Sequence, residues 1–316
     1  MAGGLTGLAG KIARLVLGSE STPGWVCVGL RDAERPVEVR LNGRDISGNH
    51  AMVSLVPFLV AIRLDGLGAL EARPSLIVWE RSTRRELGSV RLRQTEEIES
   101  PPYRIGLFET AGHSNRCLPA PRLHAHYLLQ RWRLFRDRNP RNLRMAPSEL
   151  FAKFILFSSP RPVVLVSYQL NGRGNLFPMD LVGETGAPCF LLGLHHTSPA
   201  IPAMVEAGRL AISSVPLSWK KTVFGLARNH RDAVTEWSRL PFATVPSSAA
   251  AIPVPAQALT VREVKIERTV QVGSHVLFIT TTERFERRSE DLQMCHTHGF
   301  YQMYLQRQGR PLPEVV

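Results

Sequence analysis

The chain has 316 residues, 44% of them hydrophobic, and this length can bury one large core or two ordinary ones, so we expect two domains. No run of about eighteen apolar residues is present, which excludes a membrane-spanning helix, and we expect no membrane partner. The 39 basic residues exceed the 27 acidic ones and give a formal charge of +12. Because the excess is spread along the chain and basicity alone is a sequence-independent attraction, we do not expect nucleic-acid binding.

The N-terminal stretch does not have the pattern of a secretory signal, because Lys11 and Arg14 lie inside its apolar part and no small-residue cleavage site follows. The four cysteines are far apart and form no CxxC pair, so we expect neither a disulfide framework nor a zinc ribbon. These features predict a cytoplasmic chain that begins with a short amphipathic helix or a frayed terminus.

Residues 25–110 are dominated by short runs typical of β-strands, among them WVCVGL, VEVRL, SLIVWE and GSVRLR. Turn dipeptides such as Asn42-Gly43 separate the runs, and this spacing predicts an antiparallel sheet or barrel. Next, the apolar residues of LHAHYLLQRWRLF recur at helical spacing, and the stretch after them is polar, basic and broken by prolines. We therefore predict an N-terminal β-rich domain over residues 1–135 and a linker over 136–148.

The second domain, residues 149–316, begins with a predicted helix, ELFAKFILF, and continues with strands such as VVLVSYQ and FLLGLH. Two long alternating strands, LTVREVKIERTVQV and HVLFITTTERFER, are joined at Gly273-Ser274, which predicts a β-hairpin with one face exposed to water. The predicted fold class is mainly β, with a few helices that cover the sheets.

Residues 161–188 read RPVVLVSYQLNGRGNLFPMDLVGETGAP: a strand, a tight Asn171-Gly172 turn, a second strand and a polar loop. The segments VEAGRLAISSV, LPFATV and ALTVREVKIERTVQVGSHVLFI follow in that order. Together they resemble the flavin reductase-like family with its FMN-binding split barrel, and the resemblance covers about residues 155–305. It implies a six-stranded antiparallel Greek-key barrel, usually a homodimer, with the flavin at the subunit interface.

The resemblance also implies an activity, namely hydride transfer from NADH or NADPH to FMN or FAD. The reduced flavin would either pass to a partner monooxygenase or stay bound as a prosthetic group. No Rossmann fingerprint is expected, because in this family the nicotinamide stacks on the flavin, and none is present in the sequence. In such chemistry the protein positions two rings while the cofactor performs the redox step.

Carried over residue by residue, the resemblance implies a set of site residues. His195 and His196 end a strand near the expected phosphate loop and are the candidate catalytic residues. The family has Ser or Thr at the position of Asp180 and Asn at that of Ser213, so some phosphate ligands are replaced, and Lys220 or Lys221 could supply charge instead. The candidate cofactor-binding residues are Asn175, Pro178, Met179, Asp180, Ser198, Ser213 and His275, with Tyr301 as a weaker candidate.

Residues 35–64 share with 161–194 the order RPV, LNGR, Asn, Met, Leu and then an apolar strand, which suggests an internal repeat. If the repeat is real, the chain is an intramolecular pseudo-dimer in which Asn49, His50, Ser54 and arginines of the first half face the slot of the second. The alternative is a separate β interaction domain.

Other readings remain open. In the segment Cys295-His296-Thr297-His298, the two histidines share one face of an extended strand, a spacing that zinc or iron can use. No second pair of ligands stands out, so we expect no metal. A repurposed barrel could act as a biosynthetic enzyme on a small molecule without flavin redox chemistry, with His50, His195 or His298 as acid or base. A non-catalytic binding module is the third reading.

Overall fold

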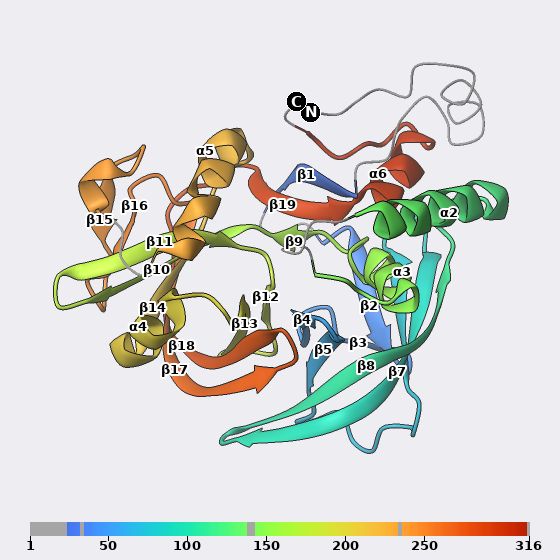
Figure 1. Cartoon of the computed structure of the whole chain (residues 1–316), viewed down its shortest axis with the longest axis horizontal. Coiled ribbons are helices and arrows are strands. Elements are labelled where there is room, and N and C mark those ends of the chain that lie inside the picture. The colour runs from blue at the N-terminus through green and yellow to red at the C-terminus, as the bar shows by residue number, and fades with distance from the viewer. Residues whose placement is uncertain (1–23, 32–34, 138–142, 233–235, 315–316) are drawn as a thin grey trace.

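A computed structural model describes residues 24–31, 35–137, 143–232 and 236–314, and it confirms the predicted mainly β fold. Figure 1 shows two sheets side by side, the first built from the N-terminal half of the chain. This first sheet has seven antiparallel strands in the order β3-β2-β6-β7-β8-β5-β4. Its strands are β2 (Val37–Leu41), β3 (Arg44–Asp45), β4 (His50–Leu55), β5 (Phe58–Arg63), β6 (Ser75–Glu80), β7 (Arg85–Ser100) and β8 (Tyr103–Asn115).

The second sheet also has seven antiparallel strands, in the order β11-β10-β14-β17-β18-β13-β12. Its strands are β10 (Val164–Leu170), β11 (Arg173–Met179), β12 (Val182–Glu184), β13 (Cys189–His195), β14 (Arg209–Ser214), β17 (Thr260–Val272) and β18 (His275–Arg287). The resemblance implied six strands in the barrel, and the sheet that carries its motifs has seven.

The two sheets have the same topology, because replacing each strand of the first by its counterpart gives the strand order of the second. The two long hairpins, β7–β8 in the first half and β17–β18 in the second, also agree in register. Val90 pairs with His113, and Arg262 pairs with Phe285. Each residue of the second pair lies 172 positions after its counterpart in the first pair. Each hairpin also has two bulges at corresponding places, after Arg91 and Gln94 in the first and after Glu263 and Ile266 in the second. The predicted internal repeat therefore exists as two copies of one sheet.

Helices and a small third sheet join the two halves. Helices α2 (Ala120–Arg136) and α3 (Pro147–Leu156) follow β8. The predicted linker, residues 136–148, overlaps the ends of both helices, and its residues 138–142 lie outside the described segments. The third sheet pairs β1 (Trp25–Leu30) with β19 (Gln293–His298) and β19 with β9 (Arg161–Pro162), so a strand assigned to the first domain pairs with the C-terminal region. Helix α6 (Gly299–Gln306) follows β19 and packs into the core of the first half.

The connection from β14 to β17 is long and folds over the second sheet. It contains η1 (Leu217–Trp219), α5 (Lys220–Gly225), η2 (Leu226–Arg231), η3 (Trp237–Arg239), β15 (Thr244–Pro246) and β16 (Pro253–Pro255). The shorter connection from β13 to β14 forms α4 (Ala200–Ala207). None of the helices in the described segments has both the length and the apolar character that a membrane span requires. The helix expected near the N-terminus lies outside the described residues.

A shared hydrophobic core holds the two copies together. It contains Ala51 and Val53 of β4, Ile105 of β8, Leu191 of β13 and Ile279 of β18. The backbones approach so closely that a side chain at Gly193 would overlap the Val53 carbonyl oxygen. Burial of this apolar surface is worth roughly 25 cal/mol per Å², so the interface between the halves is part of the fold. The structure thus supports the intramolecular pseudo-dimer over a separate interaction domain.

Candidate functional site

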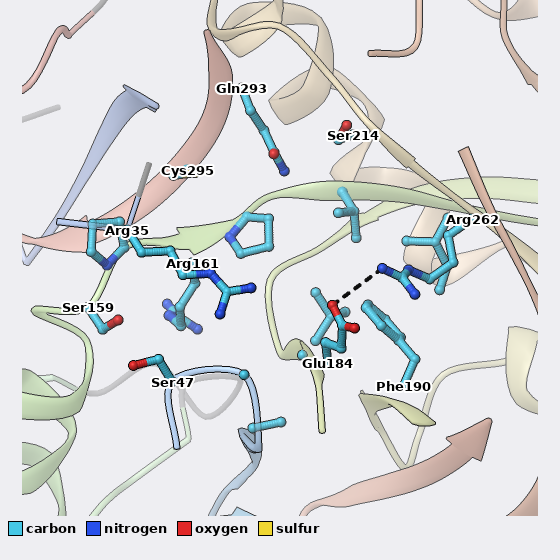
Figure 2. A pocket seen from close by; sticks show the side chains of 18 of the residues that line it. Arg35, Ser47, Ser159, Arg161, Glu184, Phe190, Ser214, Arg262, Gln293 and Cys295 are labelled. Carbon is cyan, nitrogen blue, oxygen red and sulfur yellow. Dashed lines mark ion pairs between the residues drawn. The ribbon is translucent and has the colours of Figure 1, made fainter. Parts of the chain in front are cut away.

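A cavity of about 630 Å³ lies between the two halves, where β4 of the first half approaches β12 of the second. We call it the interhalf slot. Its volume is in the range of small-molecule sites, about 300–1,000 Å³. Figure 2 shows Arg35 and Arg161 on one side of the slot and Arg262, Glu184 and Phe190 on the other. Residues from both halves therefore face one space, as the repeat hypothesis predicts for His50 and for arginines of the first half.

Arg161 is the most constrained cation of the slot. Its side chain is only 6% exposed, and its guanidinium lies 3.4 Å from the centre of the Phe157 ring. One Nη donates to the Asp180 carbonyl oxygen at 3.0 Å, and the other lies 3.2 Å from the Asp180 carboxylate. The buried Nε has no hydrogen-bond partner among the described residues. Because Arg161 lines the slot, its guanidinium would stabilise an anionic ligand at this end.

Other donors surround this end of the slot. Arg35 lies at the entry of β2, with its guanidinium close to Gly48, and the hydroxyls of Ser47 and Ser159 line the same side. Arginine and hydroxyl donors of this kind suit a phosphate group. The sequence predicted arginines of the first half at the slot but did not identify which ones.

Asp180 anchors a charged cluster beside the slot. Burial would raise the pKa of its carboxyl group, but Arg161 and a 3.0 Å hydrogen bond from His296 hold that pKa well below the usual range. Burial would in turn lower the pKa of His296, whereas Asp180 and Cys27 raise it to about 9. Near neutral pH the cluster holds one carboxylate and two cations, and its net charge is positive. Asp180 therefore binds Arg161, and its carboxylate does not need to repel a ligand phosphate.

The far end of the slot is aromatic. The Arg262 guanidinium lies 5.0 Å from the Phe190 ring centre and 4.9 Å from that of Phe285. It donates to the Thr282 hydroxyl at 2.8 Å and is 3.5 Å from the Glu184 carboxylate, the ion pair drawn in Figure 2. This arrangement gives the slot a flat, partly apolar wall with one cation in it.

His50 is the histidine that lines the slot. Its Nδ1 lies 2.8 Å from the Ile46 carbonyl oxygen, and because a carbonyl only accepts, Nδ1 carries the hydrogen. Burial lowers the pKa of His50, although the Ile46 contact opposes this. The ring is therefore neutral near pH 7 and keeps a lone pair on Nε2, which can accept a hydrogen bond or a proton.

The loop predicted to hold the flavin is covered by the chain itself. Asn175 is buried and donates to the carbonyl oxygens of Asn229 and Asp232 at 3.0 and 2.6 Å. His230 of η2 lies with Nε2 2.6 Å from the Pro178 carbonyl oxygen. The connection from β14 to β17, which the resemblance did not predict to fold here, thus occupies these polar groups.

Two further predicted residues also lie away from the slot. Met179 belongs to the core of the second half. Ser213 is fully buried, and its hydroxyl has no partner among the described residues. Its neighbour Ser214 is the serine of β14 that lines the slot. Ser214 and not Ser213 faces the slot, because successive side chains along a strand point to opposite faces of the sheet.

A second cavity, of about 430 Å³, brings several other predicted residues together. It is lined by His195 and Ser198 with His230 and Arg231. The His195 ring lies 4.9 Å from His196 and 5.5 Å from His275, measured between centroids. Burial, helped by the two neighbouring histidines, lowers the pKa of His275 to about 4. Of the predicted catalytic pair, His195 lines this cavity and His196 lies beside it, and neither lines the interhalf slot.

The other two first-half candidates, Ser54 and Asn49, lie close to the interface. Ser54 is buried with its hydroxyl 3.5 Å from that of Ser274, which in turn lies 2.9 Å from Nδ1 of His275. Asn49 donates to the Arg63 carbonyl oxygen at 2.9 Å and forms an isolated β-bridge with Thr185. Both residues connect the halves, and neither lines the slot.

The histidine pair near the C-terminus divides into two roles. His296 belongs to the Asp180 cluster, while His298 is buried and accepts a hydrogen bond from the Phe300 N–H at the start of α6. Tyr301 is fully buried in the core. Within the described segments, no group of three or more His, Cys, Asp or Glu side chains could hold a metal ion.

Comparison with known proteins gives structural matches only. No family model and no curated protein matches the chain. The Streptomyces globisporus C-1027 NADH:FAD oxidoreductase matches at 14% identity and a TM-score of 0.42, over 51% of this chain and 95% of that one. The styrene monooxygenase flavin reductase of Pseudomonas putida S12 matches at 16% and 0.39, over 47% and 93%. An FMN-binding protein from Thermus thermophilus matches at 18% and 0.36, over 40% and 71%.

The resemblance inferred from the sequence thus recurs among solved structures, which include flavin reductases and an FMN-binding protein. Their identities of 14 to 18% assign neither an activity nor a ligand to this chain.

Proposed function

We propose that the chain binds FMN or FAD in the interhalf slot and transfers a hydride to it from NADH or NADPH. The observation that carries this proposal is a single slot with Arg35 and Arg161 at one end and Phe190 and Phe285 at the other. A flavin needs these two environments, a cation for its phosphate and a flat apolar space for its ring.

The residues present fit such a group by their chemistry. Arg35, Arg161, Ser47 and Ser159 would hold the phosphate, and Phe190 would border the ring. His50 would accept a hydrogen bond from the ligand through Nε2. A bound flavin supplies the hydride acceptor, while the chain binds it, orients it and excludes water.

The partners follow from the same slot. Because both halves of one chain line it, the pseudo-dimer supplies what a homodimer interface supplies in the family that the sequence resembles. Reduced flavin would be released to a partner monooxygenase or retained. His195, which lines the second cavity, and its neighbour His196 stay predicted catalytic residues.

The visible absorption spectrum of the purified protein tests this function. With FMN added, a band near ~450 nm that bleaches with NADPH under anaerobic conditions is the expected result. Arg161→Met should weaken FMN binding by about tenfold or more. Arg93→Met is the matched control, because the Arg93 side chain is 66% exposed and pairs with Glu109 on the outer surface. Equal loss in both variants would contradict a phosphate role for Arg161.

A second function is favoured by the cover over the predicted flavin loop. Since η2 occupies Asn175 and Pro178, the slot could instead serve a phosphorylated small molecule in a reaction without flavin redox chemistry, with His50 as the base. No flavin band, together with a rise in melting temperature on adding inorganic phosphate, would support this alternative. Absence of both effects would favour a binding module.

A further inference from the structure

We propose that the chain is a one-slot pseudo-dimer, in which α3 permanently fills the slot of the first half, while Ser214, Arg262 and Phe285 form the ligand-contact wall of the second. The ligand's identity rests on the proposed function, but the filled and open states of the two slots do not.

The shared register identifies corresponding residues without any sequence alignment. Arg262 corresponds to Val90, because the two residues hold the same place in their hairpins. Arg262 pairs with Phe285 and Val90 pairs with His113, and each partner lies 23 positions further along the chain. The neighbouring strands extend the match. Ser214 pairs with Thr260 as Val78 pairs with Gly88, and Phe190 pairs with Thr280 as Val60 pairs with Phe108.

In the first half, this wall packs against α3. A side chain at Gly88 would lie 2.9 Å from the Cγ2 methyl of Ile155, and the His113 ring lies 5.7 Å from that of Phe151. Val78 and Val90 are fully buried in the same core cluster as Phe151 and Ile155. The helix therefore occupies the space that corresponds to part of the interhalf slot.

The N-terminus of α3 is fixed to the same sheet. The Glu149 carboxylate accepts hydrogen bonds from the Ala146 N–H at 3.1 Å and from the Phe58 N–H of β5 at 3.2 Å. Phe151 stacks on Tyr127 of α2 with ring centroids 3.8 Å apart. With polar groups paired at one end and aromatic rings packed along its length, α3 is built into the core and is not a lid.

In the second half, the corresponding wall is polar and faces the slot. Val78, Gly88 and Val90 are replaced by Ser214, Thr260 and Arg262, all of which line the slot. The Arg262 side chain is only 16% exposed. Desolvating a guanidinium is expensive, and an apolar wall like that of the first half would be the more stable choice. The Ser214 and Thr260 hydroxyls lie 2.6 Å apart and satisfy each other. The Arg262 guanidinium at the slot is best explained by contact with a ligand that offers acceptor atoms, such as the edge of a planar heterocycle.

Cysteine accessibility tests the open and filled states directly. Arg262→Cys and Val90→Cys place a thiol at corresponding positions of the two walls. All four natural cysteines are buried, and the wild-type protein gives the background rate, including any contribution from Cys295 at the slot. Reaction with a small disulfide reagent should be at least about tenfold faster for Arg262→Cys than for Val90→Cys. Far-UV circular dichroism checks that both variants fold.

Titration of the wild-type protein with FMN completes the test. One flavin per chain is expected, and FMN at saturating concentration should protect Arg262→Cys from the reagent. Two flavins per chain, equal reactivity of the two thiols, or protection of both would overturn the one-slot proposal. No FMN binding to the wild-type protein would instead remove the flavin assignment, and the thiol pair would still decide which slot is open.

Discussion

Arg161 and Asp180 form an ion pair, at 3.2 Å, that joins the strand β9 to the end of β11 and borders the interhalf slot. The pair also receives a hydrogen bond from His296 of β19. Three segments, one of them more than a hundred residues away in the sequence, thus meet at one carboxylate. The slot's most buried cation, Arg161, depends on that carboxylate for its position.

Replacing the carboxylate should harm both the fold and the slot. Asp180→Asn removes the charge that compensates the buried Arg161 guanidinium. We expect a loss of about 2 kcal/mol of stability, less than the ~3–5 kcal/mol for a fully buried pair, because the Asp180 side chain is 35% exposed. Urea unfolding would measure it, and FMN affinity should fall in parallel. A stability within ~0.5 kcal/mol of wild type would show that the pair is not structural.

The His296 contact predicts a dependence of stability on pH. The pKa of His296 is about 9 in the folded protein, above its ordinary value of 6.5. A raised folded pKa gives stability that is fully present below 6.5 and is lost as the pH rises toward 9. Over this window the wild-type protein should lose on the order of 2 kcal/mol relative to His296→Gln.

Lys153 sets the upper limit of that measurement. Burial, helped by Arg161, lowers the pKa of Lys153 to about 8. The buried charged form therefore destabilises the folded protein below pH 8, and stability rises as Lys153 loses its proton above that pH. The comparison between wild type and His296→Gln is therefore cleanest between pH 6.5 and 8. Parallel stability curves for the two proteins in that window would contradict the assignment of the shift to His296.

Much of the fold could be predicted from the sequence, because local patterns determine strands and turns. The Gly273-Ser274 hairpin and the Asn171-Gly172 turn are where the alternation placed them, and the repeat was visible in short shared segments. Long-range packing could not be predicted. Nothing local indicates that α3, adjacent in sequence to the second half, packs on the first, or that η2 covers Asn175.

The site illustrates the same limit. Arg161 is the first residue of the RPVV segment on which the sequence resemblance rests. Its packing on Phe157 depends on the tertiary arrangement of β9, β11 and the residues after α3, which the local sequence does not determine. Arg262 sits among alternating polar and apolar residues of β17 and looks like a solvent-facing arginine. Only its correspondence to Val90 marks it as unusual.

Asn175 separates the two possible locations of a flavin. In the structure its side chain donates to two backbone carbonyl oxygens of the covering segment, so Asn175→Ala should lower stability by about 1–3 kcal/mol. If the ligand binds in the interhalf slot, FMN affinity should change little at a temperature where the variant is folded. A loss of affinity of about tenfold or more without loss of stability would return the ligand to the predicted loop.

Gly193 tests whether the interface between the halves is integral to the fold. A Cβ at this position would overlap the carbonyl oxygen of Val53 on the opposite half, and a backbone atom cannot move aside as a flexible side chain can. Gly193→Ala should therefore cost on the order of 2 kcal/mol or more. Gly225→Ala is the matched control, because no atom lies within 4 Å of its Cβ position, and it should stay within ~0.5 kcal/mol of wild type.

Calorimetry of Gly193→Ala shows whether the two halves unfold together. If the halves were independent, they would unfold at different temperatures and give two transitions. We expect one transition at a lower temperature, because the shared core of β4, β8, β13 and β18 couples both copies.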